Sequence, residues 1–278
     1  ALLSANGFTS SSYSPLAAKL NQMGCEVRGI DVHHKMRGQK DWRSMTDHLV
    51  ESVQEWNKIS STPLIGFGHS FGGAILCCAA GRRPDLFQKL VIVDPPMFHP
   101  LVRITWRTVQ SLLGQRASQI HPLLRRTVKR RNGWASEEEA SKYLRARKPY
   151  STMNAESFRK YCEGFRRVDN VVLLPIDPEI EASIYAYFPI DIFPFNEPHV
   201  GQYDLAKVSK DVSSGWMLYS TRHELLSRSD VAWLRRNLGC LKFVPFEQGH
   251  FWPLEDVDSF AKMLASLLDE GGLPVAVQ

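Results

Sequence analysis

The stretch Leu64–Gly73, which reads L-I-G-F-G-H-S-F-G-G, decides the fold. An apolar run ends at Gly68, Ser70 follows, and the helical pattern Ala74–Ala80 begins directly after the last glycine. The pattern G-x-S-x-G between a strand and a helix is typical of a sharp turn that holds a nucleophilic serine. Such a turn brings the strand and the helix almost into contact, so small residues are needed at Gly68 and Gly72. We therefore predict that Ser70 is a nucleophile at the end of a buried strand.

The residues on both sides of this stretch alternate between short apolar runs and amphipathic segments. Strands that alternate with helices predict right-handed crossovers and a mostly parallel, doubly wound sheet, which defines the α/β class. The runs are apolar throughout, as expected for strands that are buried on both faces. The expected strands are Ala1–Ala5, Cys25–Ile30, Pro63–Gly68, Leu90–Val93, Gly215–Tyr219 and Leu241–Phe246, and the expected helices are Tyr13–Met23, Trp42–Ile59, Gly73–Ala80, Asp230–Asn237 and Val257–Leu268.

The alternation breaks between residues 97 and 210. This segment contains aromatic, arginine-rich helical patterns that are interrupted by prolines. We predict that it is a helical cap inserted into an α/β core, which residues 1–96 and 211–278 form. Most aromatic side chains of the cap are expected to form its own core, and some to line an apolar pocket. The last eight residues, 271–278, are predicted to be a loose tail.

The composition is ordinary for a globular chain of 278 residues, with 44% apolar and 23% charged residues. No apolar stretch reaches the eighteen residues of a membrane-spanning helix, so a membrane span is not expected. The first residues do not have the pattern of a secretory leader, and the abrupt start in an expected strand leaves open that a leader or earlier strands were trimmed away. The five cysteines are odd in number and irregularly spaced, which indicates reduced thiols in a cytoplasmic protein rather than disulfides or a metal site. Because the sequence also lacks a phosphate-cradling loop, no cofactor is expected.

The net charge of +5 is unevenly distributed along the chain. Residues 98–170 contain sixteen Lys and Arg against six Asp and Glu, and the density is highest at Arg125–Arg131. A solvated helix face explains this density, and attraction of an anionic substrate or a membrane surface is the alternative. None of the recognised nucleic-acid-binding modules occurs in this segment, so no nucleic-acid partner is expected.

His250 is the expected general base for Ser70. It lies in E-Q-G-H-F-W-P, between the last expected strand and the last expected helix. The carboxyl ends of parallel strands line one edge of a sheet. The fold can therefore bring His250 to Ser70 although 180 residues separate them. His69, beside the nucleophile, is expected to face away from the pocket.

The acid that would orient His250 has two candidate positions. Asp94 ends the strand pattern L-V-I-V-D, whereas Glu224 follows the strand Gly215–Tyr219 in S-T-R-H-E. We favour Asp94 over Glu224, because Asp94 lies directly at a strand end, and Asp230 ranks third.

The tetrahedral intermediate of acyl transfer needs amide donors for its oxyanion. One is predicted to be the N–H of Phe71, at the start of the nucleophile's helix, where the helix dipole also helps. The second is predicted to be the N–H of Phe8, in the loop Asn6-Gly7-Phe8 after the first expected strand.

These motifs resemble the α/β-hydrolase superfamily, and in particular its branch with a helical cap between strands six and seven. The resemblance covers nearly the whole chain and rests on Asn6-Gly7-Phe8, on G-H-S-F-G-G at 68–73, on L-V-I-V-D at 90–94 and on Q-G-H-F at 248–251. It implies that Ser70 is the nucleophile, that His250 is the general base, and that Phe8 and Phe71 supply the oxyanion amides. It also implies that the chain opens at the family's third strand.

The chain departs from the family pattern in two places that concern the site. Asn6 stands where the family usually has histidine, which matters little because the backbone acts there. The usual acid after strand seven is missing, but some relatives, haloalkane dehalogenases among them, take it from the end of strand six, where Asp94 lies. Ser70 itself argues against the epoxide hydrolases and haloalkane dehalogenases of this superfamily, which use an aspartate nucleophile.

The resulting hypothesis is a serine hydrolase that cleaves carboxylic esters of small to medium apolar acyl groups through an acyl-enzyme on Ser70. The alternatives are a thioesterase or a carbon–carbon bond hydrolase with the same triad, and a catalytically weak ligand-binding protein derived from such an enzyme. The expected partner is a small-molecule ester, without cofactor or metal.

Overall fold

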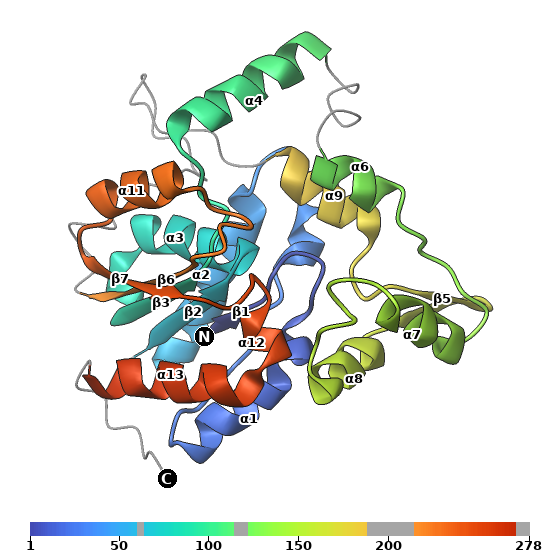
Figure 1. Ribbon diagram of the computed structural model, residues 1–278, viewed down its shortest axis with the longest axis horizontal. Helices are drawn as coiled ribbons and strands as arrows, with labels where there is room; N and C mark the ends of the chain where they lie inside the picture. The colour runs from blue at the N-terminus through green and yellow to red at the C-terminus, as the bar shows by residue number, and fades with distance from the viewer. Residues whose placement is uncertain (60–63, 114–121, 188–213, 271–278) are drawn as a thin grey trace.

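A five-stranded sheet forms the centre of the computed structural model, which describes residues 1–59, 64–113, 122–187 and 214–270 (Figure 1). The strand order is β1-β2-β3-β6-β7, and every neighbouring pair is parallel. The predicted α/β class with a mostly parallel sheet is therefore confirmed. The strands are β1 (Leu2–Leu3), β2 (Ile65–His69), β3 (Lys89–Val93), β6 (Gly215–Ser220) and β7 (Leu241–Phe246).

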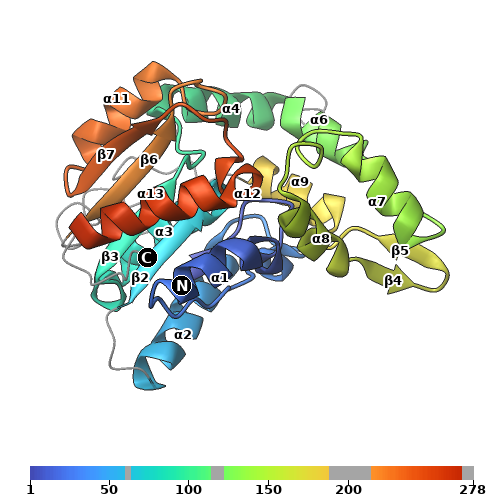
Figure 2. The ribbon, with the colours of Figure 1, turned by 60° about the horizontal axis from the view of Figure 1, so that its bottom comes forward.

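Helices cover both faces of this sheet, as Figures 1 and 2 show. One layer consists of α1 (Ser14–Gln22) and α13 (Val257–Glu270), and the other of α2 (Arg43–Ile59), α3 (Phe71–Arg82) and α11 (Arg228–Asn237). Along β3, Leu90 and Ile92 join the apolar cluster that contains α2, α3 and α11, whereas Val91 and Val93 join the cluster that contains α1 and α13. Because alternate side chains point to opposite faces, both faces of the strand must be apolar.

The segment Cys25–Ile30, predicted as a strand, does not form one. It meets the sheet through a single bridge between Leu2 and Gly29. The N–H of Leu2 donates to the carbonyl of Arg28 at 2.8 Å, and the N–H of Ile30 donates to the carbonyl of Leu2 at 2.9 Å. Since β1 has only two residues, it offers too few backbone groups for a longer ladder.

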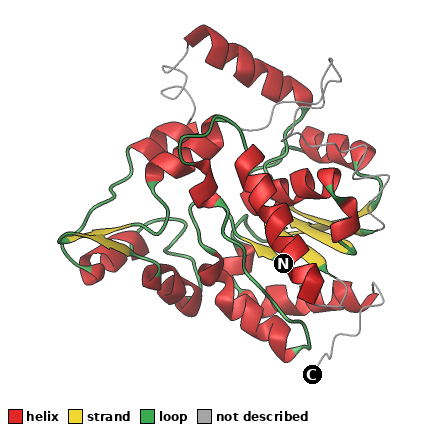
Figure 3. Cartoon of the chain, turned by 180° about the vertical axis from the view of Figure 1, so that it is seen from behind, coloured by secondary structure: helices red, strands yellow, loops and turns green. Residues whose placement is uncertain are grey.

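Between β3 and β6 the chain leaves the sheet. The described elements of this segment are α4 (Pro100–Leu113), α6 (Pro122–Val128), α7 (Glu137–Arg145), α8 (Ala155–Glu163), β4 (Arg166–Val168), β5 (Val171–Leu173) and α9 (Pro178–Ala186). The expectation of helices alone is wrong here, because β4 and β5 form an antiparallel hairpin at the far edge of the segment (Figure 3). Strands of three residues are too short to give a recognisable period in the sequence.

The predicted boundaries of the cap, 97 and 210, stay predictions. The second boundary and the predicted tail 271–278 lie outside the described residues. The remaining described elements are the short helices Ser10–Tyr13, His33–Met36 and Pro84–Leu86 and α12 (Trp252–Glu255). Within the described ranges, no helix combines the length and the apolar character that crossing a membrane requires.

Candidate active site

Ser70 occupies a sharp turn between β2 and α3. Its backbone has a positive φ (φ 54°, ψ −123°), which is strained for a residue with a side chain. The Ser70 N–H donates to the carbonyl of Val93 at 2.7 Å and ties the turn to the end of β3. A Cβ atom at Gly68 would lie 2.5 Å from the carbonyl oxygen of Gly72, and one at Gly72 would lie 2.6 Å from that of Leu3. Both positions therefore require glycine, because backbone atoms leave no room for a methyl group.

Asp94 and His250 meet at the same edge of the sheet. Asp94 directly follows β3, and its N–H donates to the carbonyl of Leu218 at 2.8 Å, which holds it beside β6. Its carboxylate Oδ2 lies 2.6 Å from Nδ1 of His250, and the Asp94 side chain is only 1% exposed. This geometry fixes the imidazole so that its Nε2 is available for chemistry.

The two other acid candidates have different partners. The Glu224 carboxylate accepts the backbone N–H of His250 at 2.8 Å rather than a ring nitrogen, and Glu224 is exposed. Asp230 caps α11, where its carboxylate accepts the N–H of Ser227 at 2.9 Å, and it also accepts the N–H of His99 at 2.6 Å. The structure thus brings Asp94 to the imidazole, places Glu224 at the backbone of the same loop, and uses Asp230 in a helix cap.

One cavity of about 500 Å³ is lined by both the predicted nucleophile and the predicted base. Ser70, Phe71 and His250 line it together with bulky apolar side chains, among them Trp42 and Phe98. The Phe71 N–H lies at the first position of α3, where helix amides have no partner within the helix. This position suits an oxyanion donor, and the apolar walls suit the hydrocarbon part of a substrate.

The position of Phe8 differs from the expectation. Gly7 has a φ of +82° and makes a tight turn that directs the N–H of Phe8 to the carbonyl of Ala5, 3.1 Å away. Phe8 does not line the cavity that Ser70 lines, whereas Ala5 and Asn6 do. The Phe8 amide is therefore occupied within the loop, and Asn6 is the loop residue nearest to the serine's cavity.

Sequence reasoning missed the contacts of His69, which lies buried behind the site. The hydroxyl of Tyr13 lies 2.6 Å from Nδ1 of His69, and Nε2 of His69 lies 2.8 Å from the carbonyl oxygen of His250. A carbonyl can only accept, so Nε2–H donates to it and the Tyr13 hydroxyl donates to Nδ1. Burial, followed by the nearby His250, lowers the pKa of His69 well below its ordinary value, so the ring is neutral at pH 7.

The Tyr13 hydroxyl also accepts the N–H of Ala5 at 3.1 Å. One side chain thus connects the turn at Asn6–Gly7 with the backbone of the His250 loop through His69. In the sequence, the only indication of these contacts is that polar residues occur within apolar segments.

The change Tyr13→Phe is expected to lower the free energy of unfolding by about 1–3 kcal/mol, because two buried polar groups lose their partner. It is also expected to lower kcat for an ester about tenfold with little change in KM, since the His69 ring that donates to the His250 carbonyl loses the hydrogen bond that orients it. Thermal denaturation and steady-state kinetics measure both effects. The control is Tyr187→Phe, an exposed tyrosine, and full stability and kcat in Tyr13→Phe would contradict the positioning role.

A second contact that the sequence did not reveal involves Glu181 on α9. Its carboxylate binds the guanidinium of Arg130, with Nη1 of Arg130 3.3 Å from Oε1, and its side chain is 7% exposed. The Asn6 side chain donates to the Glu181 carbonyl at 3.0 Å, and a Cβ atom at Gly7 would lie 2.8 Å from the carboxylate. The ion pair therefore packs on the turn at Asn6–Gly7 and neutralises the carboxylate beside it.

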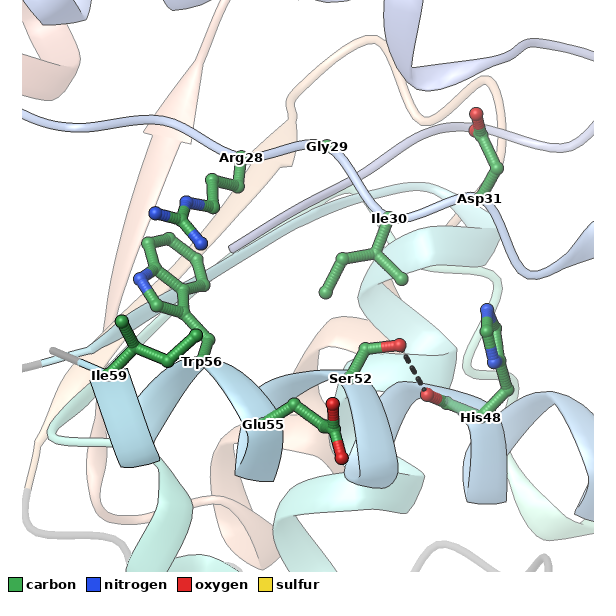
Figure 4. Close-up of a pocket in the computed structure, with 9 residues that line it drawn as sticks. All are labelled: Arg28, Gly29, Ile30, Asp31, His48, Ser52, Glu55, Trp56 and Ile59. Atoms are coloured by element: carbon green, nitrogen blue, oxygen red, sulfur yellow. Dashed lines mark hydrogen bonds between the residues drawn. The ribbon is translucent and has the colours of Figure 1, made fainter.

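A further cavity of about 330 Å³ lies between residues 28–31 and α2 (Figure 4). Figure 4 shows Arg28 stacked near Trp56, and the guanidinium carbon lies 4.8 Å from the ring centroid. None of the predicted catalytic residues lines this cavity. Among the described residues, no group of three or more His, Cys, Asp and Glu has the arrangement of a metal site.

Comparison with known families gives a match over more than half of the chain. The family model described as Hydrolase_4, serine aminopeptidase S33, matches residues 2–172. This range contains the serine turn and Asp94, and it ends before His250.

Curated relatives match over a short region. The type I acyl-CoA thioesterases mpaH of Penicillium roqueforti and Penicillium brevicompactum are each 32% identical over 78 residues, which is 28% of this chain. The matched region spans 17% of the length of these relatives.

Solved structures match over nearly the whole chain at low identity. The peroxisomal α/β-hydrolase Lpx1 of Saccharomyces cerevisiae has a TM-score of 0.70 at 13% identity and covers 100% of this chain and 77% of its own. An esterase of Mycobacterium tuberculosis has a TM-score of 0.64 at 16% identity, with 96% and 84% covered. The thioesterase domain from the curacin biosynthetic pathway has a TM-score of 0.62 at 16% identity, with 95% and 89% covered. These likenesses show the fold.

Proposed function

Because the chain belongs to the serine aminopeptidase S33 family of α/β hydrolases, we propose that it cleaves carboxylic esters of small to medium apolar acyl groups through an acyl-enzyme on Ser70. The observation that carries the proposal is the 2.6 Å contact between Asp94 and His250, which lines the same cavity as Ser70. A buried acid, an oriented imidazole and a serine in a strained turn are the parts that acyl transfer needs.

In the proposed mechanism, His250 removes the hydroxyl proton of Ser70 while the serine oxygen attacks the ester carbonyl. The carbonyl oxygen becomes an oxyanion, which the Phe71 amide stabilises together with a donor from the turn at Asn6–Gly7. The intermediate then collapses, the alcohol leaves with the proton from His250, and the acyl group stays on the serine. Water, activated by His250, attacks the acyl-enzyme and releases the carboxylic acid and the free serine.

The cavity supports an apolar acyl group of limited size. Its volume of about 500 Å³ lies within the range of roughly 300–1,000 Å³ that is usual for small-molecule pockets. Trp42, Phe98 and Trp106 contribute apolar surface to it, and burial of hydrocarbon against such surface is favourable.

A thioesterase is the second candidate function. The curated relatives mpaH are described as acyl-CoA thioesterases, and one matching solved structure is a thioesterase domain. A thioester would react by the same acyl-enzyme route, with a thiol as the leaving group in place of an alcohol.

Hydrolysis of p-nitrophenyl esters from C2 to C12 tests the proposal. We expect kcat/KM to rise with acyl length as long as the added methylenes enter the apolar cavity, because each of them buries further apolar surface. A fluorophosphonate probe should label the wild type at Ser70, as mass spectrometry of the peptide would show. Absence of both turnover and labelling would overturn the proposed function.

A further inference from the structure

We infer that a second, basic cavity beside the apolar one binds phosphate groups of the substrate's leaving group, so that the substrate is a thioester or ester whose thiol or alcohol is phosphorylated. This inference rests on the proposed function, because it concerns the leaving group of the same substrate whose acyl group is transferred to Ser70. The basic cavity has a volume of about 970 Å³, which is large enough for a leaving group of nucleotide size.

The two cavities adjoin at the turn Asn6–Gly7. They share four lining residues, namely Asn6, Leu123, Tyr185 and Phe251. Asn6 belongs to the turn at Asn6–Gly7, and Phe251 directly follows His250. The second cavity therefore lies beside the residues at which the proposed bond cleavage takes place.

The lining of the second cavity is strongly positive. Its basic side chains are Arg125, Arg126, Lys129, Arg130, Arg147 and Lys148. Glu181 is the one carboxylate among its described lining residues, and Arg130 already neutralises it. No ion pair with a described residue involves the other five cations. Like charges that converge without an anion repel one another, and a bound anion would remove that cost.

The arrangement differs from a helix face that only contacts solvent. The cations come from two segments that are separate in the sequence, residues 125–130 on and after α6 and residues 147–148 after α7, and both segments line the same space. Arg147 is also held in place, because its guanidinium stacks 3.6 Å from the ring centroid of Tyr143 and donates to the Tyr143 carbonyl at 2.6 Å. Fixed guanidinium groups suit the oxygens of a phosphate.

The chemistry of the two cavities indicates which part of the substrate each of them binds. Phosphate groups cannot enter the cavity lined by Trp42, Phe98 and Trp106 without a large desolvation cost. If the apolar acyl group occupies that cavity, the leaving group extends into the basic one. His250 donates the proton to this leaving group, and Phe251, its neighbour, lines both spaces.

Thioesters with one acyl chain and different thiols test this inference. The three probes are the coenzyme A, 4′-phosphopantetheine and pantetheine thioesters of butyrate, with p-nitrophenyl butyrate as the ester of the same acid. We expect kcat/KM for the coenzyme A thioester to exceed that for the pantetheine thioester at least about tenfold, mainly through KM, and to fall with added salt. Equal values for the first two thioesters would indicate a single phosphate contact, as in a phosphopantetheine carrier, and a higher value for coenzyme A would indicate contacts to the nucleotide phosphates.

The double variant Arg126→Gln/Lys129→Gln should lower the ratio between the coenzyme A and pantetheine thioesters at least about fivefold. Turnover of p-nitrophenyl butyrate by the same variant shows that it is folded and that its serine is active. The matched control is Lys40→Gln/Lys142→Gln, which removes two exposed cations outside the cavity lining. Turnover of p-nitrophenyl butyrate with no preference among the thiols, or an equal effect of both double variants, would overturn the inference alone. If no ester and no thioester were hydrolysed, both the proposed function and this inference would be overturned.

Discussion

The change Ser70→Ala is expected to lower kcat for p-nitrophenyl butyrate by about five orders of magnitude. The Ser70 oxygen is the atom that forms the proposed acyl-enzyme, so its removal leaves only water as a nucleophile. The residual rate would come from the remaining donors and from substrate binding. Steady-state kinetics at high enzyme concentration measure this loss, and the fluorophosphonate label should disappear with it.

The control for this change is Ser229→Ala, which removes an exposed hydroxyl on α11. Thermal denaturation should give similar stability for both variants, because alanine at position 70 has the same Cβ atom and the same backbone strain as serine. Substantial activity in a folded Ser70→Ala protein would show that the nucleophile lies elsewhere.

The change Asp94→Asn is expected to lower kcat/KM for the same ester by about three to four orders of magnitude. The Asp94 carboxylate lies 2.6 Å from Nδ1 of His250 and is almost completely buried. An asparagine at this position cannot stabilise the imidazolium that forms during proton transfer, and its amide group can favour the wrong tautomer. Kinetics at several pH values and thermal denaturation of the same samples separate a catalytic loss from a loss of folding.

Glu224→Gln is the matched comparison for Asp94→Asn. The Glu224 carboxylate accepts the backbone N–H of His250, a contact that the amide oxygen of glutamine preserves. We therefore expect a loss of less than about tenfold in kcat/KM, because an exposed hydrogen bond of this kind contributes only modestly. A larger loss in Glu224→Gln than in Asp94→Asn would assign the acid role to Glu224.

The ends of β3 and β6 are both close enough to serve the same histidine. Val93 pairs with Leu218 in the sheet, and the N–H of Ser220 approaches Oδ1 of Asp94 at 3.5 Å. An acidic residue that follows either strand therefore has its backbone at nearly the same distance from His250. Asp94 reaches the ring because it follows β3 without an intervening residue and is pinned to Leu218, whereas Glu224 extends from a loop four residues after β6.

Local sequence patterns were sufficient for the parallel sheet and for the serine turn. Apolar runs flanked by helical patterns predicted β2, β3, β6 and β7, and the structure has all four. These patterns wrongly predicted a strand at Cys25–Ile30. This segment pairs with the two-residue strand β1 through a single bridge, which is too little for a strand of its own. They also failed at the β4–β5 hairpin, whose strands are too short to show a period.

The contacts around the site depended on information that local patterns do not contain. Phe8 followed the family motif in the sequence, but the φ of +82° at Gly7 turns its amide back to Ala5. Glu181 lies three residues before Ile184 on the buried face of α9. This spacing indicates that the Glu181 side chain is buried, but it does not indicate that Arg130 is its partner.

The sequence by itself determined the class of the fold, the serine turn and the edge of the sheet where the site lies. It could do so because strand, turn and helix preferences act within a few residues, and parallel strands all end at the same edge. Only the tertiary structure decided which acid contacts His250, how Tyr13 and His69 connect the two loops, and that two distant basic segments share one cavity. These are contacts between residues up to 181 positions apart, and their geometry depends on how whole elements pack.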